Sequence, residues 1–206
     1  MNASPPAESL HQRTKDLMRA EVATTAIRLF LDRGFDETTV DDICAAAGLS
    51  RRSFFRYFPA KEDVVFNLVG RVIGQGCHHL VTAPPEEDIW SALRASMDTF
   101  ADWIDTDPDH ALALLKLIRS SANLRVSHLD HVDRWRTEAV GIIASRLGLD
   151  PDESLYPAVI ASAGFGAFNA ALTAWTTSNA TLDLRTLLDE SFAALTPHQP
   201  PAAKRG

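Results

Sequence analysis

The sequence predicts an all-α protein of about nine helices. Apolar residues recur at three- and four-residue intervals along most of the chain, as with Ala23, Ala26, Ile27 and Phe30. We find no alternating apolar and polar run that would favour a strand, no internal repeat and no glycine-rich phosphate loop. With 206 residues and 46% hydrophobic content, the chain is long and apolar enough for one or two packed domains.

Caps and breakers divide this helical pattern into segments. The first helix should end near Gly34, a second begin at Thr39, a third follow Ser50, and a fourth run from about Lys61 towards His79. Later helices are expected over 89–104, from Pro108 to Ile118, from about 132 to Gly148, and over 183–195. Between the last two, either Asp150–Glu153 starts another helix, or Pro157 kinks it or marks its real beginning.

A loop is expected at 82–88, and the composition changes after it. We expect a flexible arm over 1–12, a three-helix domain over 13–62, a larger helical domain over 63–196, and a disordered tail over 197–206.

Residues 34–62 are the most informative segment of the chain. Thr39 and Asp42 have the spacing of a capping box, and Gly48 suits a sharp turn that most side chains resist. Ser50 is placed to cap the next short helix, which carries Arg51 and Arg52 in its first turn. Two short helices around such a turn are typical of a helix-turn-helix motif.

This segment resembles the amino-terminal domain of the TetR/AcrR family of transcriptional regulators. The resemblance covers roughly the first third of the chain, and it is carried by an ordered series: Ala23, Ala26, Ile27, Phe30, Gly34-Phe35, Thr38-Thr39-Val40, Asp42-Ile43, Ala46-Ala47-Gly48-Leu49-Ser50, Tyr57-Phe58-Pro59 and Lys61-Glu62.

Arg51 and Arg52 stand where side chains of a recognition helix enter the major groove, and arginine can bind guanine through two hydrogen bonds. In an arbitrary protein, about half of such Arg-Arg pairs would simply lie on a solvated surface without a binding role. The resemblance implies phosphate contacts from Thr39, Tyr57 and Lys61. The predicted DNA-binding set is Thr39, Ser50, Arg51, Arg52, Ser53, Arg56, Tyr57 and Lys61. Two positions depart from the family pattern. The family often has a tyrosine where this chain has Phe55, and it often has a serine or threonine, which would cap the next helix, where this chain has Ala60.

The net charge of −7 does not exclude a nucleic-acid partner. Residues 1–72 hold ten basic and ten acidic side chains, whereas residues 73–206 hold ten and seventeen. All excess acid therefore lies outside the proposed DNA-binding segment, and affinity depends on local cations near phosphates.

The second half predicts a ligand site and a homodimer. Its aromatic and aliphatic stripes are more often plain core, but an effector-responsive family favours a largely apolar pocket. The predicted effector-binding residues are Trp103, Leu117, Trp135, Phe165, Phe168 and Asn169. Small residues over 158–175, with Leu184, Leu187, Leu188 and Phe192, suggest helices that pack across a two-fold axis, as a palindromic operator requires.

Several short motifs in this half resemble actinobacterial regulators grouped with the mycofactocin regulator: Trp135-Arg136, Arg146–Leu149, Ala174-Trp175 and 182–190. A fatty acyl-CoA is one effector that this resemblance implies.

An all-helical enzyme or a metal-binding protein without a DNA role is the alternative. His128 and His131 lie three residues apart, but two ligands do not complete a metal site. Cys44 and Cys77 form no disulfide framework, and no nucleophile motif or cofactor fingerprint occurs. We therefore expect that the protein binds no cofactor or metal and is not an enzyme. The sequence has no signal segment and no apolar run of about eighteen residues, so we expect a cytoplasmic protein with no membrane span.

Overall fold

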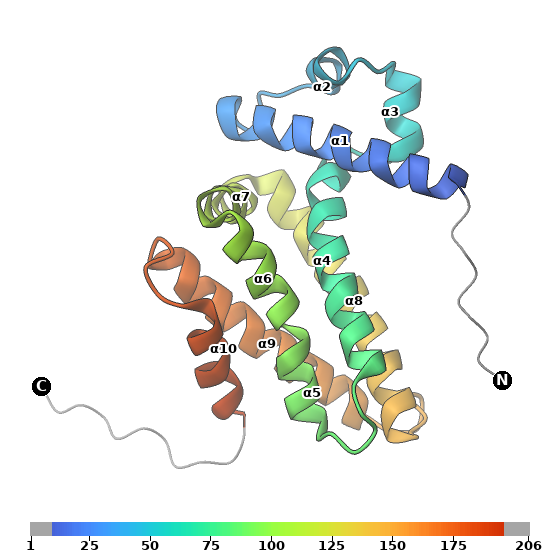
Figure 1. Cartoon of the computed structure of the whole chain (residues 1–206), viewed down its shortest axis with the longest axis vertical. Coiled ribbons are helices and arrows are strands. Elements are labelled where there is room, and N and C mark those ends of the chain that lie inside the picture. Colours follow the sequence, from blue (N-terminus) through green and yellow to red (C-terminus); the bar gives the residue numbers. More distant parts are fainter. Residues whose placement is uncertain (1–9, 196–206) are drawn as a thin grey trace, which may run out of the picture. The chain divides into compact units, whose positions relative to one another are not determined.

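A computed structural model describes residues 10–195 of the chain, and within that range it contains ten α-helices and no strand (Figure 1). The all-α prediction is confirmed. The helices are α1 Leu10–Arg33, α2 Val40–Ala47, α3 Arg51–Tyr57, α4 Glu62–Thr82, α5 Ile89–Ser96, α6 Asp98–Thr106, α7 Pro108–Ser120, α8 Ala122–Leu147, α9 Tyr156–Thr177 and α10 Leu184–Ala193. Most of the predicted arm and all of the predicted tail lie outside the described residues.

The described residues form two compact units. Unit 1 comprises the chain up to Gly70 together with Leu117–Ser127, and unit 2 comprises Arg71–Lys116 and the chain from His128 onward. We expected a boundary after residue 62 and did not expect residues 117–127 in the first unit. The chain passes between the units inside α4, α7 and α8, so each of these helices contributes residues to both.

Unit 1 has an aromatic core. The predicted stripe of α1 is buried, with Ala26 and Phe30 fully inaccessible. Phe30 packs on Phe35 with ring centroids 4.9 Å apart, and Phe54 packs on Phe58 at 5.5 Å. α1 ends at Arg33, and the next residue, Gly34, has a φ of +91°, in the left-handed region that favours glycine. The predicted helix end near Gly34 is confirmed.

Residues 117–127 contact the rest of unit 1 through a buried apolar side chain and through side-chain hydrogen bonds. Leu124 is fully buried, and Asp36 accepts hydrogen bonds from Ser121 Oγ at 3.4 Å and from Asn123 Nδ2 at 3.0 Å. Asp36 lies in the connection between α1 and α2. These pairs are separated by more than eighty residues, a distance over which helical periodicity carries no information.

The single helix expected over 89–104 is wrong, because the structure splits it into α5 and α6 at Met97. Ser96 Oγ donates to Leu93 O at 2.6 Å, and Thr99 Oγ1 donates to Ser96 O at 3.0 Å. Hydroxyl side chains that bond to the carbonyls of the preceding turn bend helices. The apolar pattern over 89–104 continues across this break, which is why it predicted a single helix.

The helix expected from about 132 begins earlier, at Ala122. Residues 150–154 form a turn rather than a helix start, with Ser154 N donating to Asp150 O at 2.9 Å. Helix α9 begins at Tyr156 with Pro157 in its first turn, where the missing N–H has no helical partner to lose. Of the alternatives left open by the sequence, Pro157 at the true beginning is the one observed.

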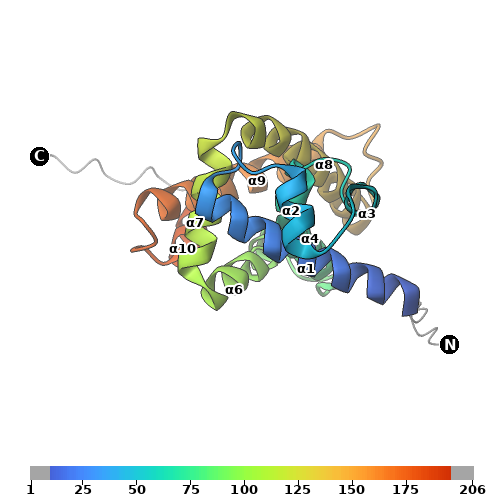
Figure 2. The same cartoon turned by 90° about the horizontal axis from the view of Figure 1, so that it is seen from above.

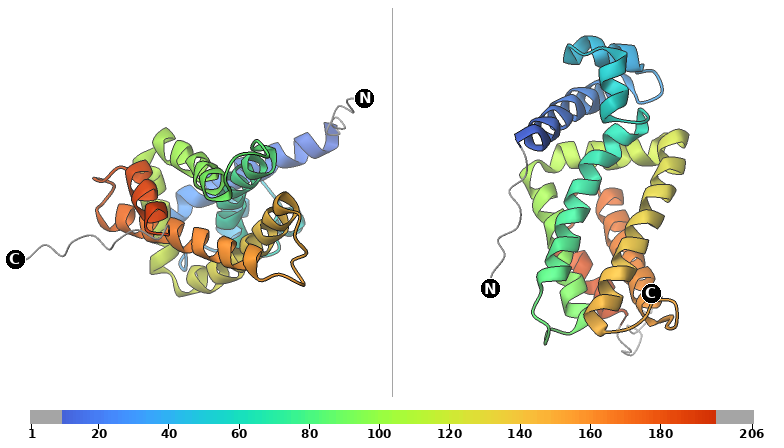
Figure 3. Two further views of the ribbon diagram at one scale, coloured as in Figure 1. Left: turned by 90° about the horizontal axis from the view of Figure 1, so that it is seen from below. Right: turned by 90° about the vertical axis from the view of Figure 1, so that its right-hand side faces the viewer.

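Unit 2 is held together by α9, which packs along α10 and against α5 (Figures 1 and 3). Leu184, Leu188 and Phe192 of α10 are buried inside the protomer, so these three side chains are not available for the dimer seam suggested by the sequence. By length and composition α9 could also cross a membrane. Nine of its residues are buried in unit 2.

Two arginines connect α10 to the break between α5 and α6. Arg94 donates to Asp189 at 2.7 Å and to Asp98 at 2.9 Å. Arg185 pairs with Asp102 and Asp105 of α6. Charge-assisted contacts of this kind fix helix register more than they add stability when they are exposed.

Glycines of α4 show which part of this helix is tightly packed. A Cβ atom at Gly76 would lie 2.6 Å from Ser96 O and 3.2 Å from Thr99 Oγ1. At Gly74, two residues earlier, a Cβ atom would meet nothing within 4 Å. Close helix packing therefore explains Gly76 but not Gly74.

Gly76→Ala and Gly74→Ala should have opposite effects on the free energy of unfolding. We expect Gly76→Ala to destabilise unit 2 by about 1–3 kcal/mol, because the methyl group meets a backbone oxygen. Gly74→Ala should stabilise by about 1 kcal/mol, the gain for replacing glycine inside a helix. Urea unfolding followed by circular dichroism measures both, and a Gly76→Ala protein as stable as Gly74→Ala would contradict the packing.

Candidate nucleic-acid interface and effector cavity

The turn between α2 and α3 has the predicted geometry (Figure 2). Thr39 is the N-cap of α2, and the reciprocal bonds of a capping box join it to Asp42, with Thr39 N donating to Asp42 Oδ2 at 2.8 Å. Donation from the Thr39 side chain and backbone lowers the pKa of Asp42 below its usual value. Gly48 has φ 66° and its N–H donates to Cys44 O. The capping box and the left-handed turn are both confirmed.

Helix α3 separates its side chains into an inward and an outward face. Ser50 caps it, with its side chain accepting from Ser53 N at 3.1 Å. Phe54 and Tyr57 are buried. The outward side chains form what we call the exposed α3 face, which consists of Arg51, Arg52, Phe55 and Arg56. Three guanidinium groups therefore lie on one exposed face of a short capped helix.

Arg51 is held by two neighbours. Its Nη1 donates to both carboxylate oxygens of Asp41, at 3.0 and 2.8 Å, and its guanidinium carbon lies 6.0 Å from the centroid of the Phe55 ring. Both partners of the ion pair are exposed, at 60% and 64% for Arg51 and Asp41. Asp41 is not among the predicted site residues, and Phe55 was predicted only to lack a hydroxyl. The helical spacing of positions 51 and 55 is a sequence signal for their contact.

Lys61 contacts its own chain. Its Nζ donates to Phe35 O at 2.7 Å and to Thr38 O at 2.8 Å, and it lies 4.1 Å from the centroid of the Phe35 ring. This lysine therefore fixes the connection between α1 and α2, with at most one N–H hydrogen left for a phosphate.

Tyr57 and Arg56 also contact each other. Tyr57 is 9% exposed, and its hydroxyl accepts from Arg56 Nη2 at 3.1 Å. The Arg56 guanidinium lies 5.0 Å from the Tyr57 ring centroid. At the carboxyl end of α3, Arg19 donates through Nε and Nη2 to Tyr57 O, at 3.2 and 2.9 Å, so this α1 residue satisfies a helix-end carbonyl.

Thr39, Ser50 and Ser53 use their hydroxyl groups locally. Thr39 Oγ1 contacts the Asp42 carboxylate, and Ser50 Oγ donates to Ser53 Oγ at 3.1 Å. Each is exposed or partly exposed. Arg52 is exposed and makes no hydrogen bond or ion pair with the residues that the structure describes.

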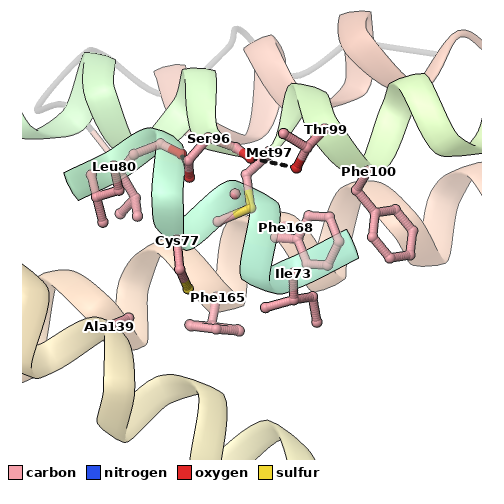
Figure 4. A pocket seen from close by; sticks show the side chains of 12 residues that line it. Ile73, Cys77, Leu80, Ser96, Met97, Thr99, Phe100, Ala139, Phe165 and Phe168 are labelled. Atoms are coloured by element: carbon pink, nitrogen blue, oxygen red, sulfur yellow. Dashed lines mark hydrogen bonds between the residues drawn. The ribbon is translucent and has the colours of Figure 1, made fainter. Parts of the chain in front are cut away.

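Unit 2 contains an apolar cavity of about 40 Å³ (Figure 4). Side chains from four stretches of helix converge on it: Ile73, Cys77 and Leu80 of α4; Leu93, Met97 and Phe100 at the α5–α6 break; Ala139 of α8; Phe165 and Phe168 of α9. No lining side chain is charged, and the hydroxyls of Ser96 and Thr99 already donate to backbone carbonyls. Burial, and secondarily the charge of Glu138, raises the pKa of the Cys77 thiol to about 11, which keeps it protonated.

The structure brings only two of the six predicted effector residues to this cavity, Phe165 and Phe168. Trp103 packs on Phe100 at 5.2 Å between ring centroids, and Trp135 packs on His131 at 5.7 Å, but neither lines the cavity. Leu117 belongs to unit 1, and Asn169 is exposed on α9. An aromatic stripe identifies core helices, but it does not show which of their faces meet around a space.

Over residues 10–195 no group of three or more His, Cys, Asp or Glu side chains is arranged to hold a metal ion. Among the described residues, the exposed α3 face, this apolar cavity and a more open pocket of about 520 Å³ that includes Glu138, Gly141 and Arg146 are the candidate binding features.

Lys61→Ala tests whether this lysine binds phosphate in addition to holding its loop. We expect unit 1 to lose about 1–3 kcal/mol of stability, because charged hydrogen bonds to two carbonyls disappear. If the ammonium also reaches a phosphate, all duplexes should bind more weakly and the salt slope of log affinity should flatten by about one unit.

Lys61→Arg, which keeps the charge, is the matched control for both measurements. A loss of thermal stability with an unchanged salt slope would restrict Lys61 to its structural role.

Comparisons with known proteins agree with this geometry. A family model described as "Bacterial regulatory proteins, tetR family" matches residues 23–68, and one described as "MftR C-terminal domain" matches residues 87–200. The transcriptional regulator TcmR of Streptomyces glaucescens is 28% identical over 77% of this chain and 73% of its own. The regulator EthR of Mycolicibacterium smegmatis is 29% identical over 66% of this chain and 65% of its own.

Solved structures share the fold. FadR of Bacillus subtilis, crystallised with stearoyl-CoA, aligns with a TM-score of 0.60 at 18% identity and covers 86% of this chain and 97% of its own. A TetR-family regulator from Streptomyces coelicolor aligns with a TM-score of 0.56 at 21% identity, over 94% and 96%. The capped turn, the exposed α3 face and the two matched models together establish that this chain belongs to the TetR family of helix-turn-helix transcriptional regulators, with a carboxyl-terminal domain of the MftR type.

Proposed function

We propose that this chain is a ligand-responsive repressor that binds a palindromic operator as a homodimer and is released by a small, largely apolar effector. The observation that carries the proposal is the exposed α3 face. Phe54 and Tyr57 anchor the helix while Arg51, Arg52 and Arg56 point outward. A major groove accepts a helix of this kind, and arginine is the side chain best suited to read guanine there.

Arg52 is the stronger candidate for direct base reading. It lies in the first turn of α3, where recognition helices contact base edges, and its guanidinium has no ion-pair partner among the described residues. Thr39, Ser50 and Ser53 lie at helix starts, where free N–H groups favour a phosphate. Tyr57 and Lys61 also contact their own chain: the Tyr57 hydroxyl accepts from Arg56, and Lys61 Nζ donates to two carbonyls, which leaves it at most one hydrogen for a phosphate.

The dimer surface that we propose is the outer side of α9 and the turns at its ends. Val159 of α9 is 59% exposed, and Leu155 and Leu182, in the turns before and after this helix, are 81% and 48% exposed. Gly166 and Ala170 of α9 are also exposed. Apolar groups that are this exposed beside small residues suit close packing of a second copy. The buried side chains of α10 would support this surface from within the protomer.

The effector that we propose is an apolar chain, with fatty acyl-CoA as one class. The cavity of about 40 Å³ has room for only a few water-sized spheres, whereas ligand sites usually have about 300–1,000 Å³. Effector binding therefore requires its walls to separate. Because no wall residue is charged, a charged group of the effector must stay outside the cavity.

Selection from a random duplex library tests the DNA-binding proposal. The enriched duplexes should contain an inverted repeat and bind two protomers, as measured by native mass spectrometry. Arg52→Ala should lose preference at one base pair of each half-site, by about 1–3 kcal/mol. Arg134→Ala, which removes an exposed arginine from unit 2, should leave the base preferences unchanged. Unaltered preferences in Arg52→Ala would refute base reading by this residue.

Thermal denaturation with lauroyl-CoA, stearoyl-CoA and free CoA tests the effector class. The acyl thioesters should raise the Tm by roughly 5–10 °C at about 100 times their Kd, and free CoA should not. Ala139→Val, which adds two carbons at the cavity wall, should reduce this shift while DNA binding without effector persists.

Gly74→Ala is the control, because a Cβ atom there meets nothing within 4 Å and the residue lines neither the cavity nor the more open pocket. If the acyl thioesters raise the Tm of Ala139→Val as much as that of the wild type, the effector binds outside this cavity.

A further inference from the structure

The two aspartates at the start of α2 have different roles. Asp42 closes the capping box with Thr39. Asp41 is not needed for the cap, and its exposed carboxylate instead accepts both hydrogen bonds from Arg51 of the recognition helix. Exposed ion pairs contribute little to folding stability, so stability does not explain this contact well. A carboxylate beside the exposed α3 face also costs affinity for a polyanion.

The contact changes what Arg51 can do. Nη1 alone makes both bonds to Asp41, so Nε and Nη2 keep their hydrogens for another acceptor. The Phe55 ring, itself packed edge-on against buried Phe54 at 5.4 Å, lies near the guanidinium. An arginine held by a carboxylate and a ring loses less rotamer freedom when it binds, and its charge is balanced before it meets DNA.

We propose that Asp41 is a specificity-determining residue: it holds Arg51 for a base edge and prevents it from binding phosphates indiscriminately. Guanine offers two acceptors, O6 and N7, that match a guanidinium edge, and a single phosphate contact carries no sequence information. An unpaired Arg51 binds whichever phosphate lies nearest. With Asp41 present, the arginine gains more from guanine than from an arbitrary phosphate. This inference rests on the DNA-binding function proposed above.

Asp41→Asn keeps the size of the side chain and removes its charge. Binding to a mixed-sequence duplex should strengthen several-fold, and its salt slope should steepen by about one unit as Arg51 takes a phosphate. The ratio of selected-duplex to mixed-duplex affinity should fall by about tenfold. Asp32→Asn, the same charge change at an exposed position of α1, should leave that ratio unchanged.

Arg51→Ala and the double variant show whether Asp41 acts through Arg51. In the Arg51→Ala background, Asp41→Asn should not lower the ratio further. The proposed role of Asp41 would be overturned if Asp41→Asn had the wild-type affinity ratio and salt slope. It would also be overturned if Asp41→Asn lowered the affinity ratio a further tenfold in the Arg51→Ala background. Neither result would affect the proposed DNA-binding function. A wild-type protein that selects no sequence from the library would overturn the proposed function and this inference with it.

Discussion

The anchoring of α3 by its aromatic side chains is the constraint on which the DNA-binding unit depends. A helix of seven residues has no stability of its own, because nucleation costs more than so few hydrogen bonds return. Phe54 is fully buried, Phe58 is 1% exposed, and Tyr57 is 9% exposed. The inward face thus determines where the outward arginines lie. The same reasoning explains why a cap at Ser50 and a left-handed glycine at position 48 accompany so short a helix.

Two cations of unit 1 satisfy backbone carbonyls, a use that the sequence does not reveal. Lys61 donates to Phe35 O and Thr38 O, and Arg19 donates to Tyr57 O. Carbonyls at loops and helix ends need donors when they are partly buried. A motif-based interpretation assigns such cations to phosphates because the motif records which residue type occurs, and not which atoms it contacts. The geometry distinguishes Arg52, which is exposed and unengaged among the described residues, from Lys61, which is engaged twice.

Local chemistry made much of this fold predictable. The buried stripe of α1, the capping box of Thr39 and Asp42, and the positive φ of Gly48 each depend on residues within one or two turns. The break at Met97 was missed because hydroxyl-to-carbonyl bonds interrupt a helix without disturbing its apolar period. The cavity was largely missed for another reason. Four stretches of helix converge there, so its lining depends on tertiary packing that no local pattern encodes.

The cavity and α4 suggest how a ligand could act on DNA binding. Residues 62–70 of α4 belong to unit 1, whereas Ile73, Gly76, Cys77 and Leu80 of the same helix line the cavity. An effector that separates the cavity walls must displace this face of α4 or the helices against it. A Cβ atom at Gly76 would lie only 2.6 Å from Ser96 O, so α4 approaches the break between α5 and α6 closely at this wall of the cavity. In the proposed function, such a displacement passes along α4, whose first residues belong to unit 1. The proposed effector would shift this equilibrium only to the extent that it binds an open cavity better than a closed one.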